Sequence, residues 1–216
     1  MKRANSQNIN FRSYWNDIYK DDVARTMYAA QGTDAGHLHH PKGEIVAQKT
    51  ARFTTALTNV KKGDKVLDIG CGVGVFTTLV KRTYPENEVW GIDISDAVIH
   101  ANMHNPEHLG IKYFPGYIGD LDLPKEYFDV IFCGETIEHL DDPNVLFKEA
   151  YEALKPGGKL VITTPKEEHI KSEEHVWYFT QGDVEQLFLN NGFKTVKFEY
   201  LKDMEHLLII FGVGEK

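Results

Sequence analysis

From residue 65 onward, short apolar runs alternate with segments whose apolar residues recur at helical spacing. The runs are rich in Val, Ile and Phe, which is typical of strands buried on both faces. They predict strands at Lys65–Ile69, Glu88–Ile94, Ile111–Ile118, Phe128–Cys133 and Lys159–Thr164, with helices at Val75–Tyr84, Asp96–His104, Val145–Leu154 and Asp183–Asn190. Two last runs, Lys194–Leu201 and His206–Val213, leave no room for a helix between them and should pair as a hairpin.

This alternation predicts an α/β fold with a seven-stranded, mostly parallel sheet and helices on both faces. One antiparallel strand comes from the terminal hairpin. An apolar stripe predicts a lid or packing helix at Glu44–Leu57, ahead of the first strand. We therefore expect one structural domain, made of an N-terminal arm and lid helix at residues 1–60 and a main α/β unit at residues 61–216.

The charge is distributed unevenly along the 216 residues, whose net charge is −8. Residues 1–65 carry 11 Lys and Arg against 6 Asp and Glu, whereas the remaining residues carry 13 against 26. An acidic body disfavours long nucleic acid, whose binding depends on neutralising phosphates. No apolar run approaches the ~18 residues of a membrane span, and two cysteines cannot build a disulfide framework. We expect a cytoplasmic protein without a membrane span.

A glycine-rich loop follows the first strand of the main unit. Gly70 and Gly72 permit a tight turn and a close approach to a ligand, and Gly74 lets the next helix start against the strand. A dinucleotide loop would place its third glycine one residue later, at Val75. Asp68 suits a ligand that bears a cation better than a pyrophosphate, which it would repel. Asp93, at the end of the second strand, is placed to accept hydrogen bonds from ribose hydroxyls.

In order and spacing, these residues resemble the class I S-adenosylmethionine (SAM)-dependent methyltransferases. The resemblance rests on the loop at residues 68–74 and on Gly91–Ser95, Gly119–Leu121, Phe128–Ile131 and Leu154–Gly158. It implies a Rossmann-like sheet of order 3-2-1-4-5-7-6, with ribose at Asp93, adenine at Asp120 and Leu121, and the methionine end at the glycines. The implied cofactor-binding residues are Asp68, Gly70, Cys71, Gly72, Gly74, Asp93, Ile94, Asp120, Leu121 and Gly134.

Acid and histidine residues follow the fourth strand, where the acceptor of an open α/β sheet is expected. Glu135, Glu138 and His139 form an E-x-x-E-H cluster, and His175 comes after the fifth strand. If this turn is helical, the two glutamates share one face. Two carboxylates and two imidazoles could hold Mg²⁺ or Mn²⁺ beside a substrate diol. His139 could instead act as a metal-free general base, because its unperturbed pKa is ~6.5.

The E-x-x-E-H cluster resembles that of two methyltransferase branches. In the small-RNA 3′-end 2′-O-methyltransferases, it binds a metal together with a later histidine. The ubiquinone-pathway catechol O-methyltransferases carry a similar run, and sugar O-methyltransferases share a looser one. Three interpretations stay open: a metal site at Glu135, Glu138, His139 and His175, a metal-free catalytic set with His139 as base, and a purely structural role.

The leading functional prediction is a SAM-dependent O-methyltransferase for a small hydroxylated acceptor, such as a sugar, a glycan terminus or a catechol-like ring. The alternatives are ribose 2′-O-methylation at an RNA 3′ end and a non-catalytic SAM-binding partner subunit. Tyr14 and Trp15 either anchor the arm over the cofactor pocket or pack in the core. The pattern leaves the oligomeric state undetermined.

Overall fold

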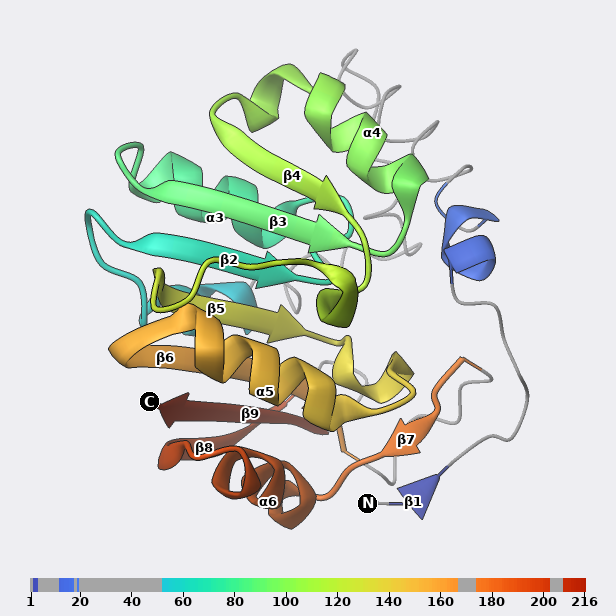
Figure 1. Ribbon diagram of the computed structural model, residues 1–216, viewed down its shortest axis with the longest axis vertical. Helices are drawn as coiled ribbons and strands as arrows, with labels where there is room; N and C mark the ends of the chain where they lie inside the picture. The colour runs from blue at the N-terminus through green and yellow to red at the C-terminus, as the bar shows by residue number, and fades with distance from the viewer. Residues whose placement is uncertain (1, 4–11, 18, 20–51, 167–173, 203–207) are drawn as a thin grey trace.

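A computed structural model describes residues 2–3, 12–17, 19, 52–166, 174–202 and 208–216 of the chain. Its centre is a seven-stranded sheet of order β4-β3-β2-β5-β6-β9-β8 (Figure 1). The strands are β2 (Lys65–Ile69), β3 (Glu88–Asp93), β4 (Ile111–Pro115), β5 (Phe128–Gly134), β6 (Leu154–Pro165), β8 (Lys194–Lys202) and β9 (Leu208–Glu215). Only β9 of these runs antiparallel to its neighbours. Numbered along the chain, the order is 3-2-1-4-5-7-6, as predicted.

Helices cover both faces of this sheet (Figure 1). They are α3 (Val75–Thr83), α4 (Asp96–His104), α5 (Pro143–Ala153) and α6 (Gln181–Asn190), and residues 52–57 are also helical. Successive strand residues enter different cores: Leu67 and Ile131 pack with residues of α5 and α6, whereas Val66 and Val130 pack with residues of α3 and Ala56. This alternation of period two is why the central strands are apolar throughout.

Several predicted boundaries differ from the structure by one or two residues, and two differ by more. β4 ends at Pro115 rather than Ile118, and residues 118–120 form a 3-10 turn. The strand predicted at Lys159–Thr164 begins earlier, because residues 154–158 are already part of β6, where the β5–β6 register shifts between Phe128 and Val130. Here the N–H of Gly157 donates to the carbonyl of Lys216, a residue at the far end of the chain.

The predicted helix at Glu44–Leu57 falls only partly within the described residues, of which 52–57 are helical. Ala56 is fully buried against the sheet, so this part is a packing helix. A separate two-stranded sheet joins β1 (Lys2–Arg3) to β7 (Trp177–Tyr178). No helix in the described part of the chain is long and apolar enough to cross a membrane.

Candidate functional site

A cavity of about 390 Å³ lies where the parallel strands end. Its walls include Ile69 at the end of β2, Asp93 at the end of β3 and Glu135 just after β5. Ligands of open α/β sheets bind at this edge, where the strand order reverses. The volume lies within the usual range for pockets that hold a small molecule, ~300–1,000 Å³.

The glycine-rich loop forms one wall of this cavity through Gly70. Gly70, Gly72 and Gly74 have φ angles of 72°, 50° and 77°, in the left-handed region that favours glycine. A Cβ on Gly70 would stand 2.2 Å from Oγ1 of Thr136, so no larger residue fits. The three glycines therefore meet both a conformational and a packing requirement.

Asp93 is held by the backbone at its position in the cavity wall. One carboxylate oxygen accepts from the N–H of Gly72 and the other from the N–H of Ser95, each at 2.9 Å. Burial raises the pKa of Asp93, and these two hydrogen bonds oppose the rise. Each oxygen keeps a further lone pair, so the fixed carboxylate can accept hydrogen bonds from a ligand's hydroxyls.

The predicted cofactor residues fall into two groups. Gly70, Asp93 and Ile94 line the cavity. The others lie outside its lining: Asp68, Cys71, Gly72, Gly74, Asp120, Leu121 and Gly134. Asp68 is only 2% exposed, and burial and the neighbouring Asp93 raise its pKa. Burial likewise raises the pKa of the Cys71 thiol, which disfavours the thiolate form that a nucleophile needs.

Sequence reasoning missed several cavity residues, including two groups outside the predicted motifs. Gly116, Tyr117 and Ile118 line the cavity directly after β4. Their place beyond a strand's carboxyl end was the available signal, but the predicted strand extended over them. Arg12 and Tyr19 of the N-terminal arm also line it.

Trp15 brings the N-terminal arm to the cavity wall. Its ring meets that of His139 edge to face, with centroids 5.2 Å apart. The adjacent Asn16 fastens the arm to the start of α4, because its Oδ1 accepts from Oγ of Ser95 at 2.8 Å and from N of Ala97 at 3.2 Å. Tyr14 packs on Trp15 and is not part of the cavity lining.

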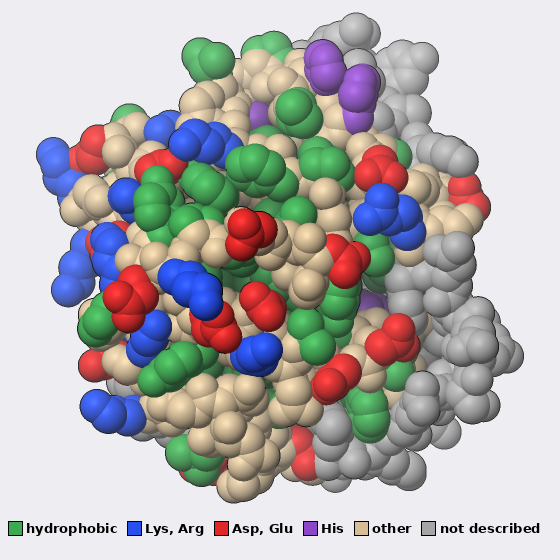
Figure 2. All heavy atoms as spheres, viewed as in Figure 1, with side chains coloured by type: hydrophobic (Ala, Val, Ile, Leu, Met, Phe, Trp, Pro, Cys, Tyr) green, Lys and Arg blue, Asp and Glu red, His purple; other side chains and the backbone are tan. Residues whose placement is uncertain are grey.

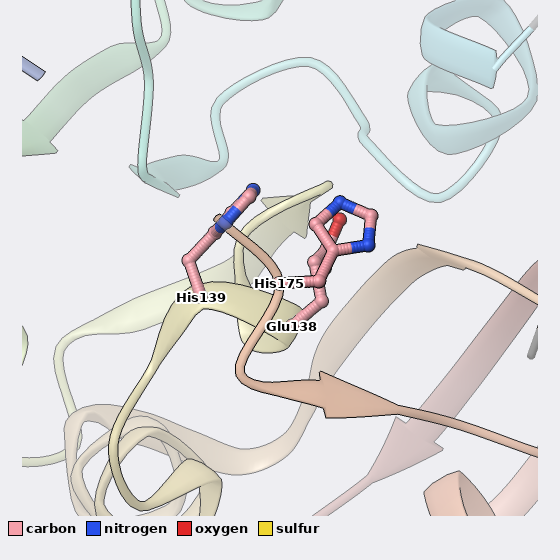
Figure 3. Close-up of side chains that lie close together, drawn as sticks. All are labelled: Glu138, His139 and His175. Carbon is pink, nitrogen blue, oxygen red and sulfur yellow. The ribbon is translucent and has the colours of Figure 1, made fainter. Parts of the chain in front are cut away.

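Glu138, His139 and His175 come together beside the cavity. Each offers a ligand atom, and these atoms lie within 4.8 Å of one another (Figure 3). Glu138 and His139 belong to the 3-10 turn η4 (Ile137–His139), and His175 precedes β7. Two hydrogen bonds clamp the segments together: Nδ1 of His139 to the carbonyl of Glu174 at 3.0 Å, and N of Val176 to the carbonyl of Glu138 at 2.7 Å. Because a carbonyl only accepts, Nδ1 carries the proton and Nε2 keeps its lone pair.

Burial dominates the electrostatics of this group. It lowers the pKa of His139 to about 4 and also lowers that of His175, so both imidazoles are neutral at pH 7. Burial, and then Glu135, raise the pKa of Glu138 well above its usual range. Glu138 also accepts from Oγ1 of Thr164 at 2.9 Å. Two neutral imidazoles and one buried carboxyl group form a donor set suited to a cation.

Glu135 lies outside this group of three, whereas the sequence placed it among four candidate ligands. Its backbone is left-handed, with φ 51°, and η4 begins only at Ile137. Glu135 and Glu138 therefore do not share a helical face. Oε2 of Glu135 lies 3.2 Å from Nη1 of Arg52 instead.

The comparison with known families now becomes informative. A family model described as a methyltransferase domain matches residues 38–197. The chain therefore belongs to this family and is a SAM-dependent methyltransferase, which confirms the resemblance drawn from its motifs. The cavity fits that cofactor, since Asp93 offers fixed acceptors and the glycine loop leaves room where a Cβ would collide. The family favours an enzyme over a non-catalytic subunit.

Known relatives differ in the atom that they methylate. Phosphoethanolamine N-methyltransferase 1 of Zea mays is 36% identical over 163 residues, which are 69% of this chain and 32% of that protein. The ubiquinone biosynthesis O-methyltransferase of Coxiella burnetii is 35% identical over 105 residues, 48% of this chain and 44% of that protein. The chain thus spans less than half the length of these relatives.

A solved structure shares the fold across nearly the whole chain. It is a putative methyltransferase of Haloferax volcanii in complex with the Trm112 methyltransferase activator, with a TM-score of 0.71. The match covers 93% of this chain and 96% of that one at 17% identity, so it bears on the fold alone.

Proposed function

We propose that the enzyme transfers the methyl group of SAM to a hydroxyl of a small acceptor, with a divalent cation held by Glu138, His139 and His175. The acceptor class is a sugar, a glycan terminus or a catechol-like ring. One observation carries the proposal: three cation ligands converge within 4.8 Å, and one of them, His139, also lines the cavity. The acceptor site thus adjoins the cofactor site.

SAM supplies a methyl group on a sulfonium centre, and this chain's residues must hold it and align the acceptor. Asp93 offers two oxygens to the ribose, and Gly70 allows the backbone close to the methionine end. Trp15 covers the cavity beside His139, which keeps water from the reacting groups. In-line transfer then depends on orientation, to which such fixed walls contribute most.

The donor set favours one kind of ion. Two imidazoles and one carboxylate suit first-row transition ions, whereas Mg²⁺ prefers oxygen ligands alone. Of the two ions expected from the sequence, Mn²⁺ therefore fits better than Mg²⁺. A divalent ion there would lower the pKa of an acceptor hydroxyl. Three protein ligands leave further positions for two neighbouring oxygens, which is why a vicinal diol or catechol is the favoured acceptor.

Calorimetry tests the cation site without knowledge of the acceptor. Mn²⁺ and Mg²⁺ are titrated into the protein with S-adenosylhomocysteine present. We expect saturable Mn²⁺ binding that is tighter than Mg²⁺ binding, and a loss of about tenfold or more in Mn²⁺ affinity in Glu138→Gln and His175→Ala. Asp122→Asn, which removes an exposed acid outside the group, should bind Mn²⁺ as the wild type does.

Two results would contradict the metal-dependent part of the proposal. One is a wild type that binds no Mn²⁺, and the other is undiminished binding in Glu138→Gln. His139 would then act alone as the base, through the lone pair on Nε2.

A second candidate is transfer to an amine. Two observations favour it: the relative from Zea mays is an N-methyltransferase, and His139 is neutral, with a pKa of about 4. A neutral imidazole can accept a hydrogen bond from an amine and orient its lone pair. Chelators separate the candidates, because methylation of an amine by this route would persist in their presence.

A further inference from the structure

We propose that Glu135 binds the α-ammonium group at the methionine end of SAM and is not a metal ligand. The inference rests on the use of this cofactor by the chain's family and not on the acceptor proposed above. It gives a role to the one member of the E-x-x-E-H cluster that the cation group leaves out.

Glu135 combines two energetically unfavourable features. Its φ of 51° lies in a region that residues with a side chain rarely adopt. Its Oε1 is buried and has no hydrogen-bond partner among the residues that the structure describes, although Oε2 pairs with Arg52. Backbone strain and an unsatisfied buried polar atom are uncommon, and they concentrate at ligand sites. Glu135 also lines the cavity, and we therefore assign the missing partner of Oε1 to a ligand bound there.

The position of Glu135 identifies the part of the cofactor that it faces. The cavity runs across the ends of β3, β2 and β5, from Asp93 past Gly70 to Glu135. Neighbouring strands are ~4.8 Å apart, so the two acids stand ~10 Å apart across the sheet. Thr136, the next residue, contacts Gly70, which places Glu135 beside the glycine loop. With the ribose at Asp93, the methionine end extends toward β5.

The chemistry of the methionine end leaves one partner for Oε1. Its carboxylate would be repelled by Glu135. Its sulfonium is cationic but has no N–H or O–H to donate. The α-ammonium carries three donors and a full charge, so it alone can supply the hydrogen bond that Oε1 lacks. Arg52 on Oε2 keeps the carboxylate in place for this contact.

A residue-by-ligand cycle tests this contact directly. Wild type and Glu135→Gln are each titrated calorimetrically with S-adenosylhomocysteine and with its desamino analogue, in which hydrogen replaces the α-ammonium. Removing the ammonium should weaken binding to the wild type by about tenfold or more. In Glu135→Gln the two ligands should bind with nearly equal affinity, because the contact is already lost.

Asp141→Asn is the matched control, since Asp141 is another acid of the cavity wall. This variant should retain the wild-type preference for the ligand that carries the ammonium. Circular dichroism and thermal melting establish that each variant is folded, and the wild-type comparison of the two ligands needs no variant at all.

Three outcomes would overturn the proposal. The wild type could bind both ligands equally. Glu135→Gln could keep the full preference for the ammonium. Glu135→Gln could lose Mn²⁺ affinity while keeping that preference, which would return Glu135 to the cation site. None of these outcomes depends on the acceptor, so the proposed function is tested separately.

Discussion

Gly63 and Gly70 have similar backbone angles, with φ of 88° and 72°, but different surroundings. A Cβ on Gly63 would meet nothing within 4 Å, whereas one on Gly70 would stand 2.2 Å from Oγ1 of Thr136. Both alanine variants should lose about 1–2 kcal/mol of stability through the left-handed backbone. Only Gly70→Ala should also bind S-adenosylhomocysteine at least about tenfold more weakly, because Thr136 must move into the cavity wall.

Urea unfolding and calorimetry on the two variants check this prediction, with Gly63→Ala as the control for strain alone. Equal cofactor affinity in both variants would mean that the side chain of Thr136 can move away from the new Cβ without weakening cofactor binding. A similar loss in Gly63→Ala would mean that strain, and not the collision, weakens binding.

At the same scale, the sequence could identify the residue types of the site but not their conformations. The glycines made the left-handed turn at residues 70–74 predictable, because only glycine adopts left-handed backbone angles readily. Nothing in the letters E-x-x-E-H indicates that Glu135 is left-handed, since a glutamate there is strained and depends on its surroundings. The i, i+3 argument therefore does not apply to Glu135, because the helical turn begins only at Ile137.

A chain of hydroxyl groups links three elements beneath the glycine loop. Thr77 of α3 donates to the carbonyl of Gly74, so its oxygen accepts from the hydroxyl of Tyr113 on β4 at 2.7 Å. The Tyr113 oxygen then accepts from Nδ1 of His108 at 2.9 Å. The direction of each bond follows from the single proton that each hydroxyl carries. Burial lowers the pKa of His108 to about 4, so its imidazole is neutral at pH 7.

The buried position of His108 leads us to expect that the free energy of unfolding depends on pH. His108 is neutral in the folded state down to a pKa of about 4, whereas unfolded histidine takes up a proton near ~6.5. Its contribution is fully present above pH ~6.5 and is lost as the pH falls from there toward 4, because the unfolded state binds the proton more readily. When the pH is lowered from 7.5 to 5, the free energy of unfolding should decrease less in His108→Gln than in the wild type, by up to about 2 kcal/mol.

Urea unfolding at the two pH values measures this difference, with the exposed His104→Gln as control. The lowered pKa values of His139 and His175 also make the folded state less stable at low pH. The variant should therefore keep part of the pH dependence. If the free energy of unfolding changed with pH in His108→Gln as it does in the wild type, the assignment of a neutral, buried His108 would be contradicted.

The elements themselves were largely predictable, and their ends were not. β2 and α4 match their predicted bounds, because β2 is a nearly continuous apolar run and Ser95 caps the beginning of α4 by accepting from N of Val98. The beginning of β6 was missed because its pairing depends on Lys216, which is distant in the chain. The same holds for the cation group, since nothing local to His175 indicates that its segment is clamped onto η4.

Charge acts at the scale of the whole molecule, where the net value is −8. In Figure 2, basic side chains gather on the side where the parallel strands begin, and acidic ones extend to the side where they end. The cavity opens on the side where the strands end, and the described part of its wall includes three acids, Asp93, Glu135 and Asp141, against the one basic residue Arg12. A polyanion that approaches the cavity therefore meets like charge. This distribution favours a small acceptor over a long RNA.

We accordingly expect no specific binding of a long single-stranded RNA, with a dissociation constant of about 10⁻⁴ M or weaker at physiological salt. Fluorescence anisotropy over a series of salt concentrations measures it. Tight binding that falls steeply with salt would contradict the expectation and favour ribose 2′-O-methylation as the function.

If such binding is observed, the double variant Lys61→Glu, Lys62→Glu, which removes two exposed cations near β2, should weaken the binding and reduce its salt dependence. An anionic oligonucleotide bound without any salt dependence would instead be recognised through its terminal ribose, and the cation group at Glu138 and His175 would then be the place to look for that contact.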